Sequence, residues 1–269
     1  MKRVVDSREL SATYSSAHQE PEDCEFRSTL DGTSQRYVQI LPSGFNPTGP
    51  NIAMIALHGH GSDRWQYIND GRGETRGARD VAAKYGMLFI SPDYRAATSW
   101  MGPKAEADVL QIITDLRKQK GVKKIFMVGA SMGGTSALIF TLRHSEIVDG
   151  VCSENGMANM VEFGGFADAI AASYGGTKVA IPNEYRQRSA ELSPQSFTMP
   201  VAITVGMKDT IVPPQSVLRL AGALHKANPK VLVIQRDDIG HLTNYDDTVA
   251  ALEFVINAAV DVRPKSKRR

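Results

Sequence analysis

The chain has 269 residues and a formal net charge of +2, with 42% hydrophobic and 22% charged residues. This length is ordinary for a single α/β domain with one large core, and the composition is globular, which argues against intrinsic disorder. A nearly neutral charge demands no acidic partner, and no stretch approaches the roughly 20 apolar residues of a membrane-spanning helix. We therefore expect neither a nucleic-acid partner nor a membrane.

The two ends of the chain are polar, and the C-terminal end is basic. Residues 1–23 are predicted to form an N-terminal arm, and residues 263–269 a basic, solvated tail rather than a targeting or nucleic-acid-binding segment. The arm lacks the apolar core of a signal peptide, so the sequence as written predicts a cytoplasmic protein. A secreted chain whose export signal had been removed would look the same. Residues 24–262 form the predicted domain.

Near the N-terminus, two strand-like runs at 25–29 and 36–41 flank Asp31-Gly32-Thr33, a pattern that predicts a β-hairpin. Beyond the hairpin, short apolar runs alternate with amphipathic stretches. The predicted strands cover residues 51–57, 87–91, 124–128, 148–152, 201–205 and 231–234. The predicted helices cover residues 74–85, 105–120, 134–144, 214–226 and 246–260. This alternation predicts an α/β fold whose mostly parallel central sheet is covered by helices on both faces.

One long segment, residues 156–198, interrupts the alternation of strands and helices. It is rich in Gly and Ala and contains several aromatic residues, among them Phe163 and Phe166. Because a structureless loop of this length is unusual, we predict a small cap-like insertion over the sheet. The two phenylalanines indicate either an aromatic-lined pocket or ordinary apolar core.

The segment Gly129-Ala130-Ser131-Met132-Gly133 matches the nucleophile elbow, a tight turn between a strand and a helix. Such a turn needs small residues beside the serine, which it holds in a strained conformation above the sheet. The following helix directs its N-terminal N–H groups at a reacting carbonyl. Because a predicted strand precedes the motif and a predicted helix follows it, Ser131 is the candidate nucleophile.

A serine nucleophile needs a base, and the base needs an acid to orient it. His241 follows the last predicted strand, and Asp209 follows the strand before it. The chain order Ser, Asp, His is the order of this type of fold. Asp237 and Asp238 are rival acids, but they lie close to His241 along the chain.

The segment His58-Gly59-His60-Gly61-Ser62-Asp63 follows the first central strand and has two interpretations. In the first, the backbone N–H groups of His60 and Met132 form an oxyanion hole, worth on the order of 3 kcal/mol per donor. In the second, His-x-His and the nearby aspartate bind a metal. A zinc site needs a further ligand, and no second cluster at ligand spacing is visible, so the sequence favours the oxyanion loop and no metal.

Two residues that follow the second central strand, Arg95 and Trp100, are candidate substrate-binding residues. The broad ring of Trp100 is suited to stacking on a sugar or an aromatic group. For Arg95 the alternative is a structural ion pair with Glu106 or Asp108 in the next helix.

Together these motifs resemble the α/β-hydrolase superfamily over residues 24–260. Within it, they resemble the branch that contains prolyl-oligopeptidase-type peptidases and related carbohydrate and feruloyl esterases. The motifs that carry the resemblance are Gly129-Ala130-Ser131-Met132-Gly133-Gly134, Arg188-Ser189 before Pro200-Val201, Lys208-Asp209-Thr210-Ile211-Val212-Pro213-Pro214-Gln215-Ser216 and Gly240-His241. Peptidases of that branch carry a large β-propeller before the hydrolase domain, and 269 residues leave no room for one. This departure favours an esterase.

The resemblance implies acyl transfer through Ser131 without a cofactor. The predicted substrate is a small-molecule or carbohydrate ester with a short-chain or aromatic acyl group. A small peptidase or amidase is the alternative, and a non-catalytic binding module is a third hypothesis, which the complete Ser, Asp, His set disfavours. The acyl group, the alcohol and the oligomeric state are not readable from the sequence.

Overall fold

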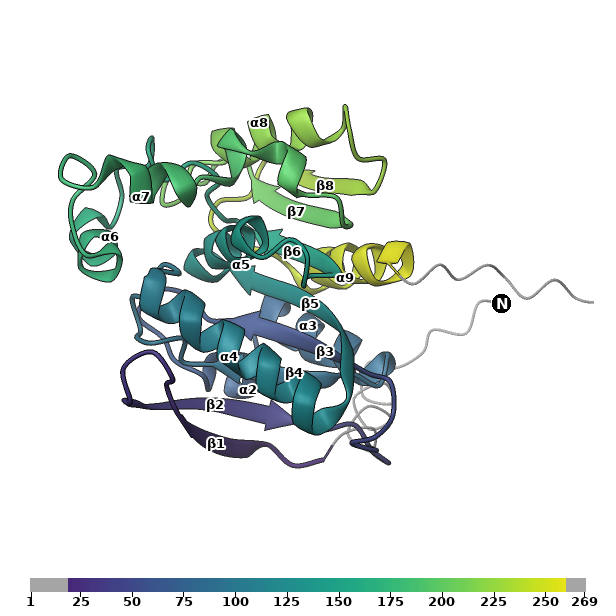
Figure 1. Ribbon diagram of the computed structural model, residues 1–269. Helices are drawn as coiled ribbons and strands as arrows, with labels where there is room; N and C mark the ends of the chain where they lie inside the picture. The colour runs from purple at the N-terminus through teal and green to yellow at the C-terminus, as the bar shows by residue number, and fades with distance from the viewer. Residues whose placement is uncertain (1–18, 260–269) are drawn as a thin grey trace, which may run out of the picture.

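The computed structural model describes residues 19–259, which form one eight-stranded sheet flanked by helices (Figure 1). The strands are β1 (Glu22–Arg27), β2 (Ser34–Ile40), β3 (Asn51–Leu57), β4 (Leu88–Pro92), β5 (Val122–Ala130), β6 (Gly150–Glu154), β7 (Val201–Gly206) and β8 (Val231–Arg236). The helices that flank the sheet are α2 (Gln66–Asn69), α3 (Gly73–Lys84), α4 (Pro103–Lys120), α5 (Met132–Arg143), α8 (Gln215–Leu224) and α9 (Tyr245–Ala259). Most of the predicted arm and all of the predicted tail lie outside the described residues, and β1 begins within the last residues assigned to the arm.

The sheet order is β1-β2-β4-β3-β5-β6-β7-β8. The first two strands run antiparallel to their neighbours, and every pairing from β4 to β8 is parallel. The predicted hairpin closes where Ser28 N–H donates to Thr33 O at 2.9 Å. The predicted α/β class with a mostly parallel sheet is therefore confirmed. Because the carboxyl ends of parallel strands meet at one edge, the loops that follow β3, β5, β6, β7 and β8 meet there as well.

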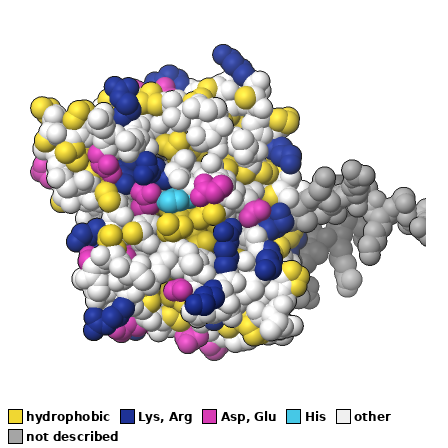
Figure 2. Space-filling view, in the orientation of Figure 1, with side chains coloured by type: hydrophobic (Ala, Val, Ile, Leu, Met, Phe, Trp, Pro, Cys, Tyr) yellow, Lys and Arg dark blue, Asp and Glu magenta, His cyan; other side chains and the backbone are white. Residues whose placement is uncertain are grey.

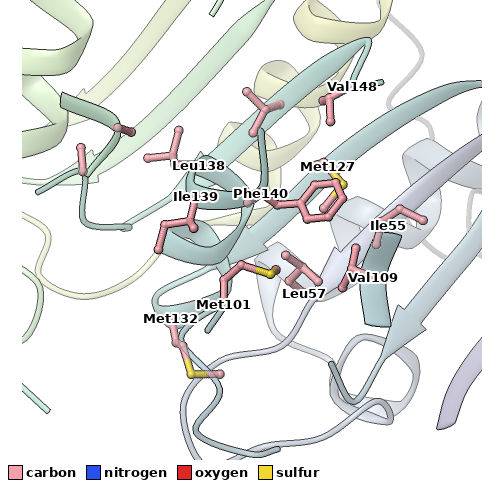
Figure 3. Close-up of a cluster of buried hydrophobic side chains, with 14 of the residues drawn as sticks. Ile55, Leu57, Met101, Val109, Met127, Met132, Leu138, Ile139, Phe140 and Val148 are labelled. Atoms are coloured by element: carbon pink, nitrogen blue, oxygen red, sulfur yellow. The ribbon is translucent and has the colours of Figure 1, made fainter. Parts of the chain in front are cut away.

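Helices cover both faces of the sheet and form two apolar cores. Helices α4, α5 and α8 pack on one face, and α3 and α9 pack on the other. Figure 3 shows part of the first core, where Phe140 of α5 lies beside Met127 of β5. The central strands are buried on both sides, which explains why the sequence of β3 is almost continuously apolar.

The segment 156–198 between β6 and β7 forms two short helices, α6 (Ala167–Tyr174) and α7 (Pro182–Gln187), and two 3₁₀ turns. Its helices lie together at one end of the sheet, on the left in Figure 1. The buried Arg188 fixes this segment to α4, because its guanidinium pairs with Glu106 at 2.7 Å and also donates to Met101 O at 2.7 Å. Burial alone raises the pKa of the Glu106 carboxyl, but the hydrogen bond from His144 and the charge of Arg188 outweigh it and hold that pKa at about 2.

The surface carries charges of both signs. On the face shown in Figure 2, acidic and basic side chains lie interspersed with apolar ones. None of the helices between residues 19 and 259 combines the length and the apolar character that crossing a bilayer requires.

Candidate active site

Ser131 occupies a sharp turn between β5 and α5. Its backbone is in the left-handed region, with φ 59° and ψ −121°, which is strained for a non-glycine residue. The turn holds this conformation because Ser131 N–H donates to Glu154 O on β6 at 2.8 Å. The turn also demands glycine nearby, since a Cβ on Gly133 would lie 1.9 Å from Leu57 O. The sequence motif therefore produces the elbow geometry locally, and the neighbouring strands lock it.

Two further loops at the same edge bring His241 and Asp209 to the serine. His241 Nε2 lies 2.8 Å from Ser131 Oγ, and His241 Nδ1 lies 2.6 Å from Asp209 Oδ2. The other carboxylate oxygen of Asp209 accepts the N–H groups of Ile211 and Val212, each at 2.9 Å. Asp209 is thus held by its own loop, and with Nδ1 protonated the ring presents Nε2 to the serine hydroxyl. These separations are those that proton transfer from the hydroxyl to the ring requires.

A buried side chain that the sequence analysis did not single out, Asn155, ties these loops together. It follows β6 directly, donates to Thr243 Oγ1 at 2.8 Å and accepts Gly206 N–H at 3.1 Å. Thr243 lies two residues after His241, and Gly206 ends the strand that leads to Asp209. Asn155 therefore braces the loop of the histidine against the strand of the aspartate. Its position directly after a central strand is the signal that could have found it.

The two candidate oxyanion donors lie at the ends of β3 and β5. Met132 N–H belongs to the first turn of α5, where it has no intrahelical acceptor. On either side of His60, Gly59 N–H donates to Gln66 Oε1 and Gly61 N–H donates to Ala97 O, each at 2.7 Å. His60 N–H has no hydrogen-bond acceptor within residues 19–259. Both N–H groups are thus available to a ligand.

The structure corrects the interpretation of Trp100 and Arg95 as substrate-binding residues. Trp100 is 0% exposed, and its ring packs against Phe163 and Phe166 of the insertion while its Nε1–H donates to His60 Nδ1 at 3.1 Å. No face of its ring is available for stacking on a sugar. The two phenylalanines belong to the same packed cluster, so apolar core is the interpretation that the structure supports for Phe163, which is itself buried.

Arg95 is held by structural ion pairs. Its Nε lies 2.8 Å from Asp108 Oδ2, and its Nη1 lies 3.0 Å from Asp31 Oδ2 in the β1–β2 hairpin. The contacts therefore show the alternative predicted for Arg95, a structural ion pair with Asp108 in the next helix, α4. Glu106, the other partner considered, pairs with Arg188 instead.

A pocket of about 50 Å³ opens beside Ser131 and His241. Tyr67 of α2 and Glu74 of α3 line it from the side of the sheet that faces α9. Burial raises the pKa of the Glu74 carboxyl, although Arg72 lies within 3.3 Å of one of its oxygens. Neither residue was predicted, because Glu74 lies in a predicted helix at ordinary spacing and Tyr67 lies in a segment for which the sequence predicted no element.

A second buried carboxyl, that of Glu154, lies close to this pocket. Burial, reinforced by the nearby carboxyl of Glu74, raises its pKa to about 8, even though Thr248 Oγ1 donates to Glu154 Oε1 at 2.7 Å. Glu154 is therefore mostly neutral at pH 7.

Metal binding finds no support in these contacts. Within residues 19–259, no group of three or more His, Cys, Asp or Glu side chains is placed to hold a metal ion. His58 is buried, with Nδ1 2.9 Å from Gly59 O and Nε2 3.2 Å from Asp93 O, and burial lowers its pKa. His60 is engaged by Trp100, so the two histidines of the His-x-His segment face different partners.

The sheet order, the elbow and the loops at its carboxyl edge define an α/β-hydrolase fold with the site of a serine hydrolase. A comparison with protein-family models matches residues 91–256 to the prolyl oligopeptidase family, and the chain belongs to that family of serine hydrolases. The resemblance inferred from the sequence motifs is thereby confirmed. A comparison with curated proteins finds no match.

Solved structures of similar fold include both esterases and peptidases. An esterase of Pyrococcus furiosus is 18% identical, with a TM-score of 0.60, and the match covers 96% of each chain. A fluorophosphonate-binding serine hydrolase of Staphylococcus aureus is 17% identical, with a TM-score of 0.66 over 89% of this chain and 98% of that one. A putative dipeptidyl aminopeptidase IV of Bacteroides ovatus is 18% identical, with a TM-score of 0.68 over 90% of this chain. The present chain spans only 36% of that peptidase.

Proposed function

We propose that the protein is a serine esterase that hydrolyses short-chain carboxylic esters through an acyl-enzyme on Ser131. The observation that carries the proposal is the continuous hydrogen-bond chain from Ser131 Oγ through His241 to Asp209. The ester preference is supported by the similarity to the Pyrococcus esterase over nearly the whole length of both chains. The pocket of about 50 Å³ beside Ser131 has room for a short acyl group, and an ester with an aromatic acyl group is the alternative form of this substrate.

The proposed mechanism follows from the geometry. Ser131 Oγ attacks the ester carbonyl carbon while His241 Nε2 accepts the hydroxyl proton, and the resulting imidazolium is stabilised by Asp209. The negative charge that develops on the carbonyl oxygen is stabilised by the N–H groups of His60 and Met132. His241 then gives its proton to the leaving alcohol. Water, deprotonated by His241, attacks the acyl carbon and releases the acid, which restores the Ser131 hydroxyl.

A small peptidase or amidase remains the second candidate, because the family is one of oligopeptidases and peptidases are among the similar structures. The two candidates share the acyl-enzyme and differ in the leaving group. A carbohydrate ester is one form that the substrate of the first candidate can take.

A hydrolysis panel separates these candidates. It includes nitrophenyl acetate, butyrate and octanoate, acetylated xylan, and aminoacyl and prolyl nitroanilides, with Ser131→Ala and the exposed-serine control Ser34→Ala assayed beside the wild type. We expect turnover of the short esters in the wild type and Ser34→Ala, none in Ser131→Ala, and silent anilides. Rapid anilide turnover points instead to the peptidase.

Covalent labelling gives an independent readout of the nucleophile. A fluorophosphonate forms a bond to an activated serine oxygen with loss of fluoride, so the mass of the labelled peptide identifies the residue. Labelling at a serine other than Ser131 contradicts the proposed nucleophile, and the absence of both labelling and turnover supports the non-catalytic binding module.

A further inference from the structure

The pocket beside Ser131 contains polar atoms that the fold itself leaves unpaired. The hydroxyl of Tyr67 and one carboxyl oxygen of Glu74, Oε2, have no hydrogen-bond partner among the described residues. Tyr67 is 1% exposed and Glu74 is 5% exposed, and both line the pocket together with Ser131 and His241. A buried polar group without a partner is costly, and native proteins rarely keep one without a use. Two such atoms in the same pocket, next to the nucleophile, point to a ligand that pairs with them.

The charges around the pocket indicate that this ligand is neutral. The other oxygen of Glu74 already lies 3.3 Å from Arg72 Nη1, and Arg72 Nε lies 2.6 Å from Asp70 Oδ2. A second cation, Arg79, donates to the backbone oxygens of Tyr67 and Asp70. Arg72 therefore contacts both carboxylates, and Arg79 adds a second positive charge that interacts with Asp80 and Asp70, so a further positive charge gains little here. Among the residues that line the pocket, none donates a hydrogen bond to Glu74 Oε2 and none pairs with the Tyr67 hydroxyl.

A hydroxyl group satisfies both needs, because it can donate to a carboxylate oxygen and accept from a phenol at the same time. The volume of the pocket, about 50 Å³, leaves room for roughly three to five non-hydrogen atoms. We propose that this pocket binds a small hydroxylated group of the substrate, with Glu74 Oε2 accepting its proton and the Tyr67 hydroxyl donating to its oxygen. This inference rests on the proposed esterase function and specifies its substrate class. The hydroxyl belongs either to the acyl group or to the alcohol of the ester.

Isosteric ester pairs test the proposal and distinguish these two sources. Methyl glycolate and methyl propionate differ only by a hydroxyl in place of a methyl group on the acyl side, and 2-hydroxyethyl acetate and propyl acetate differ in the same way on the alcohol side. For the wild type, we expect kcat/KM to favour the hydroxylated member of one pair by about tenfold or more, because one of the hydrogen bonds is to a charged group. We expect that ratio to fall by about tenfold in Tyr67→Phe and to fall in Glu74→Gln.

The matched control is Tyr85→Phe, which also removes one phenolic oxygen. Tyr85 follows α3 and its hydroxyl contacts Asn257 of α9 at 3.2 Å, away from the pocket residues. The control should keep the wild-type ratio. The proposal is overturned if neither pair is discriminated, or if the ratio is the same in the wild type, Tyr67→Phe and Glu74→Gln. A Glu74-dependent preference for glycine methyl ester over methyl glycolate also overturns it, in favour of a cationic ligand.

The failure of the proposed function can be told apart from the failure of this inference. If the wild type hydrolyses the apolar esters as fast as their hydroxylated isosteres, the esterase stands and the pocket assignment fails. If no ester is hydrolysed, protection of Ser131 from a fluorophosphonate is measured with glycolamide and propionamide. Stronger protection by glycolamide, lost in Tyr67→Phe, supports the hydroxyl pocket, and equal protection by the two amides overturns it.

Discussion

Replacing Glu154 by glutamine probes the buried carboxyl that lies beneath the nucleophile turn. Glu154 is 0% exposed, and its Oε2 has no hydrogen-bond partner among the described residues. Burial raises its pKa from the ordinary value of 4.5 to about 8, so the folded protein keeps this side chain protonated through most of the neutral range. Glutamine has the shape of the protonated acid and retains an oxygen that can accept from Thr248.

The size of the effect follows from the two pKa values. An unfolded chain releases the Glu154 proton near pH 4.5, whereas the folded protein holds it until about pH 8. Between these limits the folded state binds more protons, so the free energy of unfolding falls as the pH rises. Each pKa unit corresponds to about 1.4 kcal/mol, which makes the full loss about 5 kcal/mol above pH 8. Glu154→Gln lacks this loss. We therefore expect it to match the wild type near pH 5 and to be more stable by about 3–5 kcal/mol at pH 9.

Urea unfolding followed by tryptophan fluorescence, repeated at each pH unit from 5 to 9, measures this difference. The comparison of two variants removes the contributions of groups that do not interact with Glu154, such as His58, whose pKa burial lowers. Glu253→Gln on the outer surface of α9 serves as the control for loss of a carboxylate. If the stability curves of the wild type and Glu154→Gln run parallel across this range, Glu154 is not held neutral and the reasoning is wrong.

Three further substitutions test the site and its supports. Asp209→Asn should lower kcat by about 10³–10⁴-fold in steady-state ester hydrolysis, because the amide favours the wrong tautomer of His241; near-normal turnover would make Asp237 or Asp238 the acid. Asn155→Ala, which removes the hydrogen bond to Thr243, should lower kcat by at least about tenfold with a smaller change in KM. A rise in KM with kcat unchanged would contradict the positioning role of Asn155. Arg188→Met should lower the free energy of unfolding by about 3 kcal/mol in urea titrations, because it removes the buried guanidinium that pairs with the carboxylate of Glu106. An unchanged urea midpoint would refute that contact.

Local sequence patterns were sufficient to predict a mostly parallel sheet and to place the candidate residues of the site directly after its strands. The apolar run at 51–57 coincides with β3, and the small residues around Ser131 correspond to a turn whose geometry admits little else. The rule that parallel strands end at one edge places the loops of Ser131, Asp209 and His241 together. These features depend on periodicity and on turn chemistry, which act over a few residues.

Other features depended on contacts between distant segments. Trp100 lies on the expected rim, but Phe163 and Phe166 of the insertion pack against its ring, and its Nε1–H donates to His60. Glu74 is an ordinary residue of a predicted helix and Tyr67 lies in a segment without a predicted element, and only the fold brings them beside Ser131.

The amino-acid sequence by itself thus determined the fold class and was sufficient to predict the candidate residues Ser131, Asp209 and His241 and their order along the chain. Only the tertiary structure decided which polar atoms stay unpaired in the pocket, which aromatic rings are covered and which buried carboxyl stays neutral. The physical reason is that propensity, patterning and turn geometry are local, whereas desolvation and hydrogen-bond pairing depend on every element packed around a group. Glu154 is an example, since the sequence shows an ordinary acid after a strand and its raised pKa arises from the burial that the folded chain imposes.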